Sequence, residues 1–153
     1  MLVGGAIFSI VKDWQNPLFH DWFFHILSFG IGTLLLMLSF RAAANGGREL
    51  KKGRVGDIPR LETNRLVTTG IYACMRHPML LGLTLLPLAV AFLLTSPTFI
   101  TLIAPLEMLF IVMIVLIFEE MEVRKKFGKA YEAYKKEVPM VSFRWECLKR
   151  LFG

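Results

Sequence analysis

The chain has 153 residues, of which 55% are hydrophobic and thirteen are Phe, and its formal net charge is +6. This length allows one domain, and a soluble domain of this size is mostly surface and cannot bury so much apolar area. The composition therefore excludes an ordinary soluble domain and indicates a membrane protein. The excess of Lys and Arg flanks apolar segments, as in the cytoplasmic loops of membrane proteins, so we expect no nucleic-acid partner.

Residues 1–18 predict a helix that is too short to span the membrane. Its apolar stretch, Leu2–Val11, is shorter than the roughly 20 residues that a spanning helix needs. We therefore expect this segment to lie at the membrane interface or to pack as a half-helix. No basic segment precedes it, so we expect no cleaved signal peptide. Asn16-Pro17 is a turn signal that should end the helix.

Residues 19–41 predict the first membrane helix, and a long polar connection follows it. The apolar run Trp22–Phe40 begins with an aromatic residue that is expected to anchor the helix at the interface. His25 inside this run is expected either to face a polar cavity or to be satisfied in packing. Residues 42–78 are polar and basic, and their glycines, including Gly46-Gly47, argue against one continuous helix.

Residues 79–118 predict a tight hairpin of two membrane helices, because only Ser96-Pro97 separates two apolar runs. Glu107 lies inside the second helix, where a carboxylate is either functional or bonded to a partner near the interface. The link of the hairpin has no charge, whereas the preceding connection and the tail 119–153 are basic, so the positive-inside rule places both on the cytoplasmic side. Three membrane helices, or four if the first segment also crosses, then form an all-α integral membrane helical bundle.

The tail predicts a C-terminal amphipathic helix that packs against the membrane or the protein core. Residues at three- and four-residue steps share one face of a helix. That face holds Glu120, Arg124, Phe127, Tyr131, Tyr134 and Val138.

The two cysteines, Cys74 and Cys147, have neither the spacing of a metal site nor the pattern of a disulfide framework. Both lie in segments that we expect to face the cytoplasm, where thiols stay reduced. We therefore expect two ordinary reduced cysteines and no metal.

Two polar segments are expected to meet at one membrane face, because the hairpin starts after one and returns to the other. The first ends in Arg76-His77-Pro78 and the second is Glu119-Glu120. Arg76 and His77 can hold a carboxylate, and the free N–H groups of a helix that starts at Pro78 can bind an anion. Glu119 or Glu120 can accept hydrogen bonds from an ammonium group or ribose hydroxyls. Together these groups suit a zwitterionic ligand, although Arg-His is also a common interfacial anchor and Glu-Glu a common solvated helix end.

Five motifs follow one another between about Leu66 and Pro139. They are Gly70-x-Tyr72, Arg76-His77-Pro78-x-x-x-Gly82, Glu119-Glu120, Phe127-Gly128-x-x-Tyr131-x-x-Tyr134 and Val138-Pro139. Their order and spacing resemble the isoprenylcysteine carboxyl methyltransferase and phospholipid methyltransferase superfamily. The resemblance implies that residues 1–153 form a single membrane methyltransferase domain. It also implies methyl transfer from S-adenosylmethionine to a lipid-like or isoprenoid-like substrate that enters from the bilayer.

The resemblance also implies a set of site residues on the cytoplasmic side of the membrane. Those that would hold S-adenosylmethionine are Leu66, Val67, Tyr72, Arg76, His77, Pro78, Met79, Leu80 and Glu119. An amine acceptor must lose a proton before it attacks the methyl group, and Glu120 is the candidate base for that step.

Three positions depart from the family pattern. Leu80 stands where a Tyr is usual, and Val123 stands where a Leu is usual. Val115 stands where enzymes that act on prenylcysteine tend to carry an Arg, so a substrate carboxylate would lack its counter-charge there. A lipid amine is less affected, which keeps phosphatidylethanolamine N-methylation as an alternative reaction.

Two alternatives come from other classes of protein. Some membrane reductases that use NADPH carry a similar Tyr, His-Pro and Glu arrangement, but their chains are generally longer than this one. A non-enzymatic membrane scaffold would bind no small molecule at all. The sequence leaves the oligomeric state open.

Overall fold

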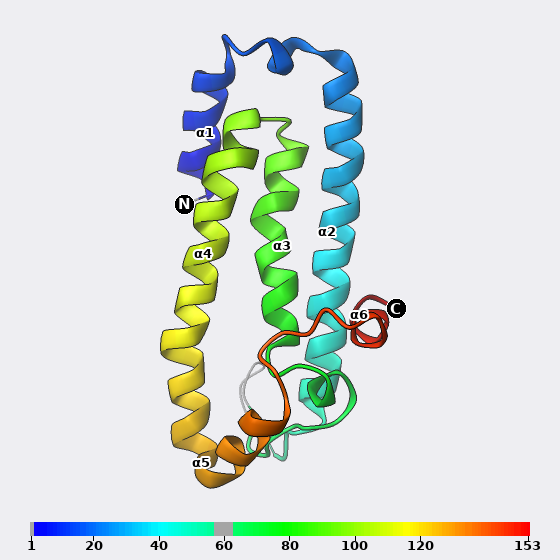
Figure 1. The fold of residues 1–153 in the computed structure, drawn as a ribbon, viewed down its shortest axis with the longest axis vertical. Helices are drawn as coiled ribbons and strands as arrows, with labels where there is room; N and C mark the ends of the chain where they lie inside the picture. Colours follow the sequence, from blue (N-terminus) through cyan, green and yellow to red (C-terminus); the bar gives the residue numbers. More distant parts are fainter. Residues whose placement is uncertain (1, 57–62) are drawn as a thin grey trace. The chain divides into compact units, whose positions relative to one another are not determined.

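The computed structural model describes residues 2–56 and 63–153, and its regular secondary structure over these ranges is entirely helical (Figure 1). Part of the predicted connection 42–78, residues 57–62, lies outside the described residues. The predicted all-α class is confirmed. The elements are α1 (Leu2–Asp13), η1 (Pro17–His20), α2 (Trp22–Lys51), η2 (Gly70–Ala73), α3 (Pro78–Leu93), η3 (Phe99–Ile103), α4 (Ala104–Ile114), η4 (Val115–Glu119), α5 (Glu120–Glu137) and α6 (Trp145–Phe152).

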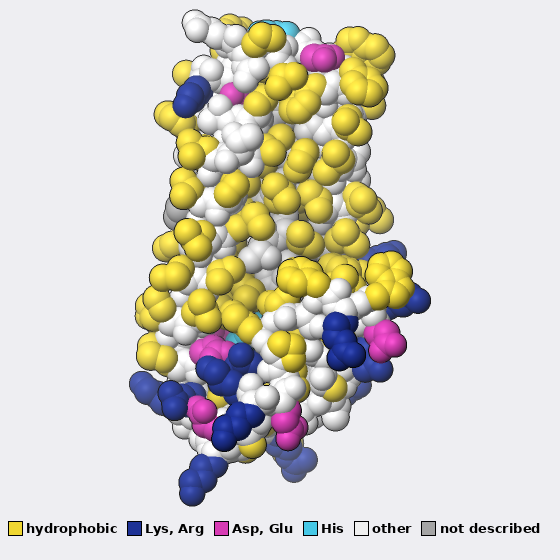
Figure 2. Space-filling model, in the orientation of Figure 1, with side chains coloured by type: hydrophobic (Ala, Val, Ile, Leu, Met, Phe, Trp, Pro, Cys, Tyr) yellow, Lys and Arg dark blue, Asp and Glu magenta, His cyan; other side chains and the backbone are white. Residues whose placement is uncertain are grey.

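The chain divides into two compact units. Unit 1 comprises Met1–Ser39 and Leu83–Met113, and unit 2 comprises Phe40–Gly82 and Ile114–Gly153. On the face drawn in Figure 2, hydrophobic side chains cover most of unit 1, and Lys and Arg side chains gather over unit 2.

Unit 1 is apolar outside and partly polar inside, the reverse of a soluble domain. Phe23, Ile26 and Phe29 of α2 are 61%, 64% and 59% exposed, whereas Ser28 beside them is 1% exposed. Two helical stretches, Trp22–Lys51 and Phe99–Glu137, are long and apolar enough to cross a membrane, and α3 is a shorter apolar helix. Exposed apolar side chains of this extent are stable against lipid and not against water, so the protein is a membrane protein.

Polar groups connect the helices inside unit 1. Ser28 Oγ donates to the carbonyl of Phe92 at 2.7 Å. The ring nitrogens of His25 lie 2.7 Å from Thr95 Oγ1 and 2.7 Å from the carbonyl of Phe19. The predicted packing role of His25 is therefore the one observed. Where the surroundings are lipid, helices associate through van der Waals packing and through bonds such as these rather than through hydrophobic burial.

The first segment is a half-helix that caps the hairpin. Helix α1 ends before Asn16-Pro17, as the turn signal predicted. The Asn16 side chain caps the following element, η1, by accepting from the N–H of Leu18. Asp13, 1% exposed, accepts from the hydroxyls of Ser96 and Thr98 and, at 3.1 Å, from the N–H of Thr98. The carboxylate thus satisfies free N–H and O–H groups in the link before η3.

Two helical arms with a short link between them occupy the range where the hairpin was predicted, residues 79–118. Helix α3 begins at Pro78 and ends at Leu93, and η3 begins at Phe99. Ala91, Phe99 and Ala104 form one buried cluster, so the two arms pack on each other. Glu107 is 5% exposed, and its Oε1 has no hydrogen-bond partner among the described residues.

Helix α2 continues to Lys51 instead of ending near residue 41. The connection 42–78 is not one continuous helix, as predicted, but the helix ends at Lys51 and passes through Gly46-Gly47, where Gly46 serves close packing. A Cβ on Gly46 would lie 2.6 Å from Cγ of Met79, so only glycine lets Met79 approach the helix this closely.

The tail is not one straight amphipathic helix. Gly128 inside α5 has φ 51° and ψ −125°, which breaks the helix into two arms. The predicted face therefore divides: Glu120, Tyr131 and Tyr134 are buried, whereas the Arg124 side chain is 69% exposed and pairs with Glu132. The positive φ is a conformation that glycine alone adopts without strain, and no count of helical steps reveals it.

The expectation of two reduced cysteines is wrong, because Cys74 and Cys147 form a disulfide with a Cα–Cα distance of 5.7 Å. A buried cluster of Ala42, Ile71, Tyr72, Met75, Cys147 and Leu151 brings η2 and α6 together. The end of α6 is fixed as well, since Asn45 Nδ2 donates to the carbonyl of Leu151 at 2.6 Å. Packing of the two segments, which sequence spacing does not show, places the sulfur atoms within bonding reach.

Replacement of Asp13 by Ala should destabilise unit 1. The hydroxyls of Ser96 and Thr98 would lose their buried acceptor, which typically costs about 1–3 kcal/mol. Thermal unfolding in detergent, followed by circular dichroism, measures the change. Lys12→Ala, which changes an exposed neighbour in the same helical turn, is the matched control. Equal transition temperatures for the two variants would contradict the capping role.

Candidate functional site

The centre of unit 2 is built where the chain enters α3. The segment before α3 lies against the tail: Arg76 N–H donates to the carbonyl of Pro139 at 2.9 Å, and His77 N–H donates to the carbonyl of Met140 at 3.0 Å. Pro78 is the first residue of α3 and is fully buried. These contacts fix the backbone of Arg76 and His77, so both side chains project from a rigid backbone.

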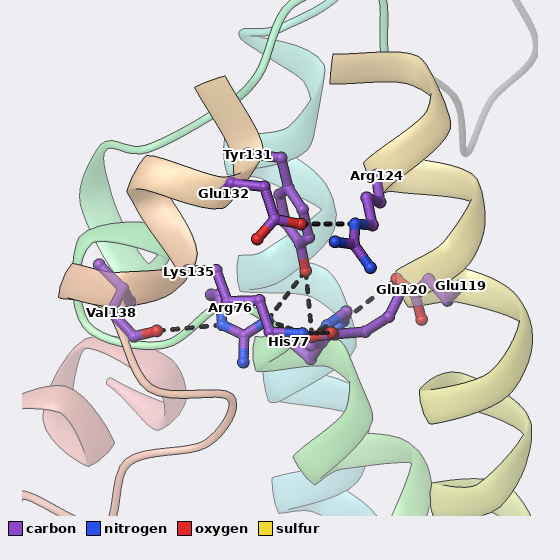
Figure 3. A network of polar contacts seen from close by, with 9 residues as sticks. All are labelled: Arg76, His77, Glu119, Glu120, Arg124, Tyr131, Glu132, Lys135 and Val138. Atoms are coloured by element: carbon purple, nitrogen blue, oxygen red, sulfur yellow. Dashed lines mark hydrogen bonds and ion pairs between the residues drawn. The ribbon is translucent and has the colours of Figure 1, made fainter. Parts of the chain in front are cut away.

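Arg76 and Glu120 form a buried ion pair (Figure 3), with side chains 9% and 10% exposed. The guanidinium also donates through Nη1 to Tyr131 Oη at 2.9 Å and through Nε to the carbonyl of Val138 at 3.0 Å. Charge, hydrogen bonding and planar geometry are thus used together, as suits Arg in a buried pair. The predicted meeting of the Arg-His and Glu-Glu segments is observed.

His77 lies between the two glutamates. Its Nε2 is 3.3 Å from Glu120 Oε1, and its Nδ1 is 3.4 Å from Glu119 Oε1. The His77 side chain is 5% exposed, whereas the Glu119 side chain is 53% exposed. The ring therefore links a buried carboxylate to a carboxylate that solvent or a ligand can reach.

The second arm of α5 supplies two residues whose roles the sequence did not assign. Tyr131 Oη donates to Glu120 Oε1 at 3.0 Å, and Lys135 Nζ donates to Glu120 Oε2. These residues lie 11 and 15 positions after Glu120, and the break at Gly128 turns the chain so that both reach back to it. The Phe-Gly-x-x-Tyr motif contained Tyr131, but only the backbone turn shows its partner.

Glu120 is held as a carboxylate. Burial by itself would raise the pKa of this group. Hydrogen bonds from Lys135, Tyr131 and His77 act in the opposite direction. With the charge of Arg76 added, they lower the pKa of Glu120 from 4.5 to about 2. A carboxylate with so low a proton affinity is a poor proton acceptor near neutral pH.

The remaining predicted residues lie in the same unit 2. Tyr72 is buried, its carbonyl accepts from Tyr134 Oη, and Val67 packs against the cluster that contains it. Leu80 is 5% exposed at the start of α3, and Met79 beside it contacts Gly46. Leu66 is half-buried. Those ranges also hold no group of three His, Cys, Asp or Glu side chains that could bind a metal ion.

Gly128→Ala should lower stability, because Ala is strained at a positive φ where glycine is not. We expect a loss of about 1–2 kcal/mol, and the strain would move Tyr131 and Lys135 away from Glu120. Gly47→Ala is the matched control: Gly47 lies in α2 with open space around it, and Ala there should be neutral or stabilising. Thermal unfolding in detergent measures the change in stability of each variant relative to wild type. A loss of stability in both variants, or a gain in both, would count against the argument.

The Glu120 network should make stability depend on acid pH. The folded pKa lies below the ordinary 4.5, so the network stabilises the protein fully above about pH 4.5, and this contribution is lost as the pH falls towards 2. The stability difference between wild type and Glu120→Gln should therefore be largest above pH 4.5 and shrink below it. Glu132→Gln, which changes an exposed ion pair, should show little difference at any pH. A difference between wild type and Glu120→Gln that stays constant through this range would rule the linkage out.

Comparison with known proteins identifies a family to which the chain is similar. The family model described as phospholipid methyltransferase matches residues 23–130. The match includes Arg76, His77, Glu119 and Glu120. No curated protein and no solved structure matches the chain.

Proposed function

Because the chain belongs to the phospholipid methyltransferase family, and is thus a membrane methyltransferase, we propose that it transfers a methyl group from S-adenosylmethionine to a lipid-like acceptor. The observation that carries the proposal is the contact of His77 with both Glu119 and Glu120, inside the matched range and in one compact unit. The predicted resemblance is confirmed at the level of the family. The methyl donor, the acceptor and the site residues are our proposal.

The residues around His77 fit the cationic groups of a donor such as S-adenosylmethionine, because the carboxylate of Glu119 is accessible there. S-adenosylmethionine, when bound, supplies a methyl carbon that its sulfonium makes electrophilic. Glu119 is the accessible carboxylate, and we assign it with His77 to hold the donor. Tyr72, Pro78, Met79 and Leu80 form the adjoining apolar wall, and Leu66 and Val67 precede it. Alignment in a dry site is the main contribution that an enzyme must make to this transfer.

Arg76 and Glu120 have a positioning role in this proposal. We expected Arg76 to hold a ligand carboxylate, but its guanidinium already binds Glu120, Tyr131 and the carbonyl of Val138. Glu120 was the candidate base, yet its four partners and its low pKa oppose proton uptake. Both residues therefore hold His77 and the tail in place. The proton of an amine acceptor leaves through His77 and the accessible Glu119.

An amine acceptor such as the phosphatidylethanolamine headgroup fits this charge arrangement better than a carboxylate acceptor. Two cations of the site, Arg76 and Lys135, are both engaged by Glu120. A substrate carboxylate would meet counter-charges that are already paired, next to the negative Glu119. An amine nitrogen that attacks the methyl carbon forms an N–C bond while the S–C bond breaks, and its proton passes to the protein.

Titration of S-adenosylhomocysteine into detergent-purified protein tests the donor site. We expect saturable binding by wild type that His77→Ala weakens about tenfold or more, the usual cost of losing a charge-assisted contact. His20→Ala, which changes an exposed histidine in unit 1, should bind like wild type. Transfer of a labelled methyl group to phosphatidylethanolamine, compared with a farnesylcysteine analogue, then identifies the acceptor.

Two results would overturn the proposal. Folded wild type that binds NADPH but not S-adenosylhomocysteine would favour the reductase alternative. Folded wild type that binds neither, with lipid added back, would favour a non-enzymatic membrane protein.

A further inference from the structure

One buried carboxylate oxygen in unit 2 has no partner among the described residues. It is Oε2 of Glu49, in the last turn of α2. The other oxygen, Oε1, accepts from Lys52 Nζ at 2.6 Å, and the Lys52 side chain is 64% exposed. Lys52 thus satisfies the outer side of the carboxylate and leaves its inner side bare. A buried acceptor without a partner typically costs about 1–3 kcal/mol, so the inner oxygen calls for a ligand.

The inner side of Glu49 lies against the turn that leads to the site. Gly70 begins η2 with φ 60°, and a Cβ at this position would lie 2.5 Å from Cδ of Glu49. Glycine is therefore required here both by the backbone conformation and by the approach of Glu49. Only Ile71 separates Gly70 from Tyr72 in the same 3₁₀ helix.

Tyr72 is the second buried residue next to Glu49. The residue is 8% exposed and belongs to the same 3₁₀ helix as Gly70. Burial raises the pKa of the Tyr72 phenol, and the negative charges of Glu119 and Glu49 raise it further. Both carboxylates therefore lie close enough to act on the same phenol, although they come from different elements.

We propose that Glu49, together with Tyr72 and Glu119, forms a binding site for a primary ammonium group. Two carboxylates give an ammonium charge-assisted hydrogen bonds, the tyrosine hydroxyl can accept a further one, and the ring offers its face. An anion would be repelled by both glutamates, and a neutral apolar group would leave Glu49 Oε2 unsatisfied. This assignment rests on the proposed function, because Glu119 is also the residue assigned there to the donor.

The ammonium has two chemical sources in the proposed reaction. One is the α-ammonium group of S-adenosylmethionine, and the other is the headgroup of an aminolipid. The shared chemistry defines the site, and binding measurements separate the sources.

Calorimetric titration of Glu49→Gln distinguishes them, since Gln keeps the shape of the side chain and removes its charge. If the site binds the donor, affinity for S-adenosylhomocysteine should fall about tenfold or more. Affinity for 5′-methylthioadenosine, which lacks the ammonium group, should stay unchanged. If the site binds the acceptor, both nucleoside affinities should stay unchanged, and the KM for phosphatidylethanolamine vesicles should rise about tenfold or more.

Lys52→Gln is the matched control, because it removes the outer partner of Glu49 and leaves the proposed site intact. It should bind all three ligands like wild type. Tyr72→Phe should show a smaller loss for the same ligand as Glu49→Gln.

Equal affinities and KM values for Glu49→Gln and wild type would overturn the assignment, as would an equal loss in Lys52→Gln. Either result would leave the proposed function standing if wild type binds S-adenosylhomocysteine. Wild type that binds neither S-adenosylhomocysteine nor the aminolipid would overturn the proposed function and this site together.

Discussion

Unit 2 depends on the buried pair of Arg76 and Glu120. Removal of either partner from such a pair leaves a buried charge without compensation, which costs more than the pair itself contributes. Here the pair also joins the turn before α3, the start of α5 and the returning tail, through Tyr131, Lys135 and the carbonyl of Val138. The buried ring of His77 and the accessible carboxylate of Glu119 take their positions from this support. Of the neighbouring glutamates, Glu120 therefore belongs to the buried support and Glu119 to the accessible part of the site.

Much of this arrangement was predictable, because apolar run lengths determine which helices can span a membrane. The hairpin, the half-helix α1 and the meeting of Arg76-His77 with Glu119-Glu120 follow from where those runs begin and end. The division of labour inside the motif was not predictable. Arg76 and Glu120 have the same residue types as a ligand site would have, and only the contacts show that they bind each other. Glu49 gave no signal, since its place depends on the fold of η2.

The predictions from sequence that were wrong have physical causes, and the periodicity of hydrophobic residues carries no information about them. Gly46 was taken as a helix breaker, but it admits Met79 at close range, and Gly128 lies in a helical pattern but breaks the helix. Glycine can serve either purpose, and the backbone conformation decides which. In unit 1 the same limitation concerns Asp13, whose buried role follows from the hydroxyl groups that it meets in the hairpin link.

The disulfide gives unit 2 a covalent topology that its helices alone do not have. Cys74 and Cys147 are 73 positions apart, so the bond closes a ring that contains the hairpin, the ion pair and both arms of α5. By the loop-entropy model, a ring of this size removes conformational freedom from the unfolded chain worth roughly 4 kcal/mol. A peptide bond cut anywhere inside the ring would leave both pieces joined. Under oxidising conditions, a single cut between Arg76 and Lys135 would therefore leave the two parts of the site covalently joined.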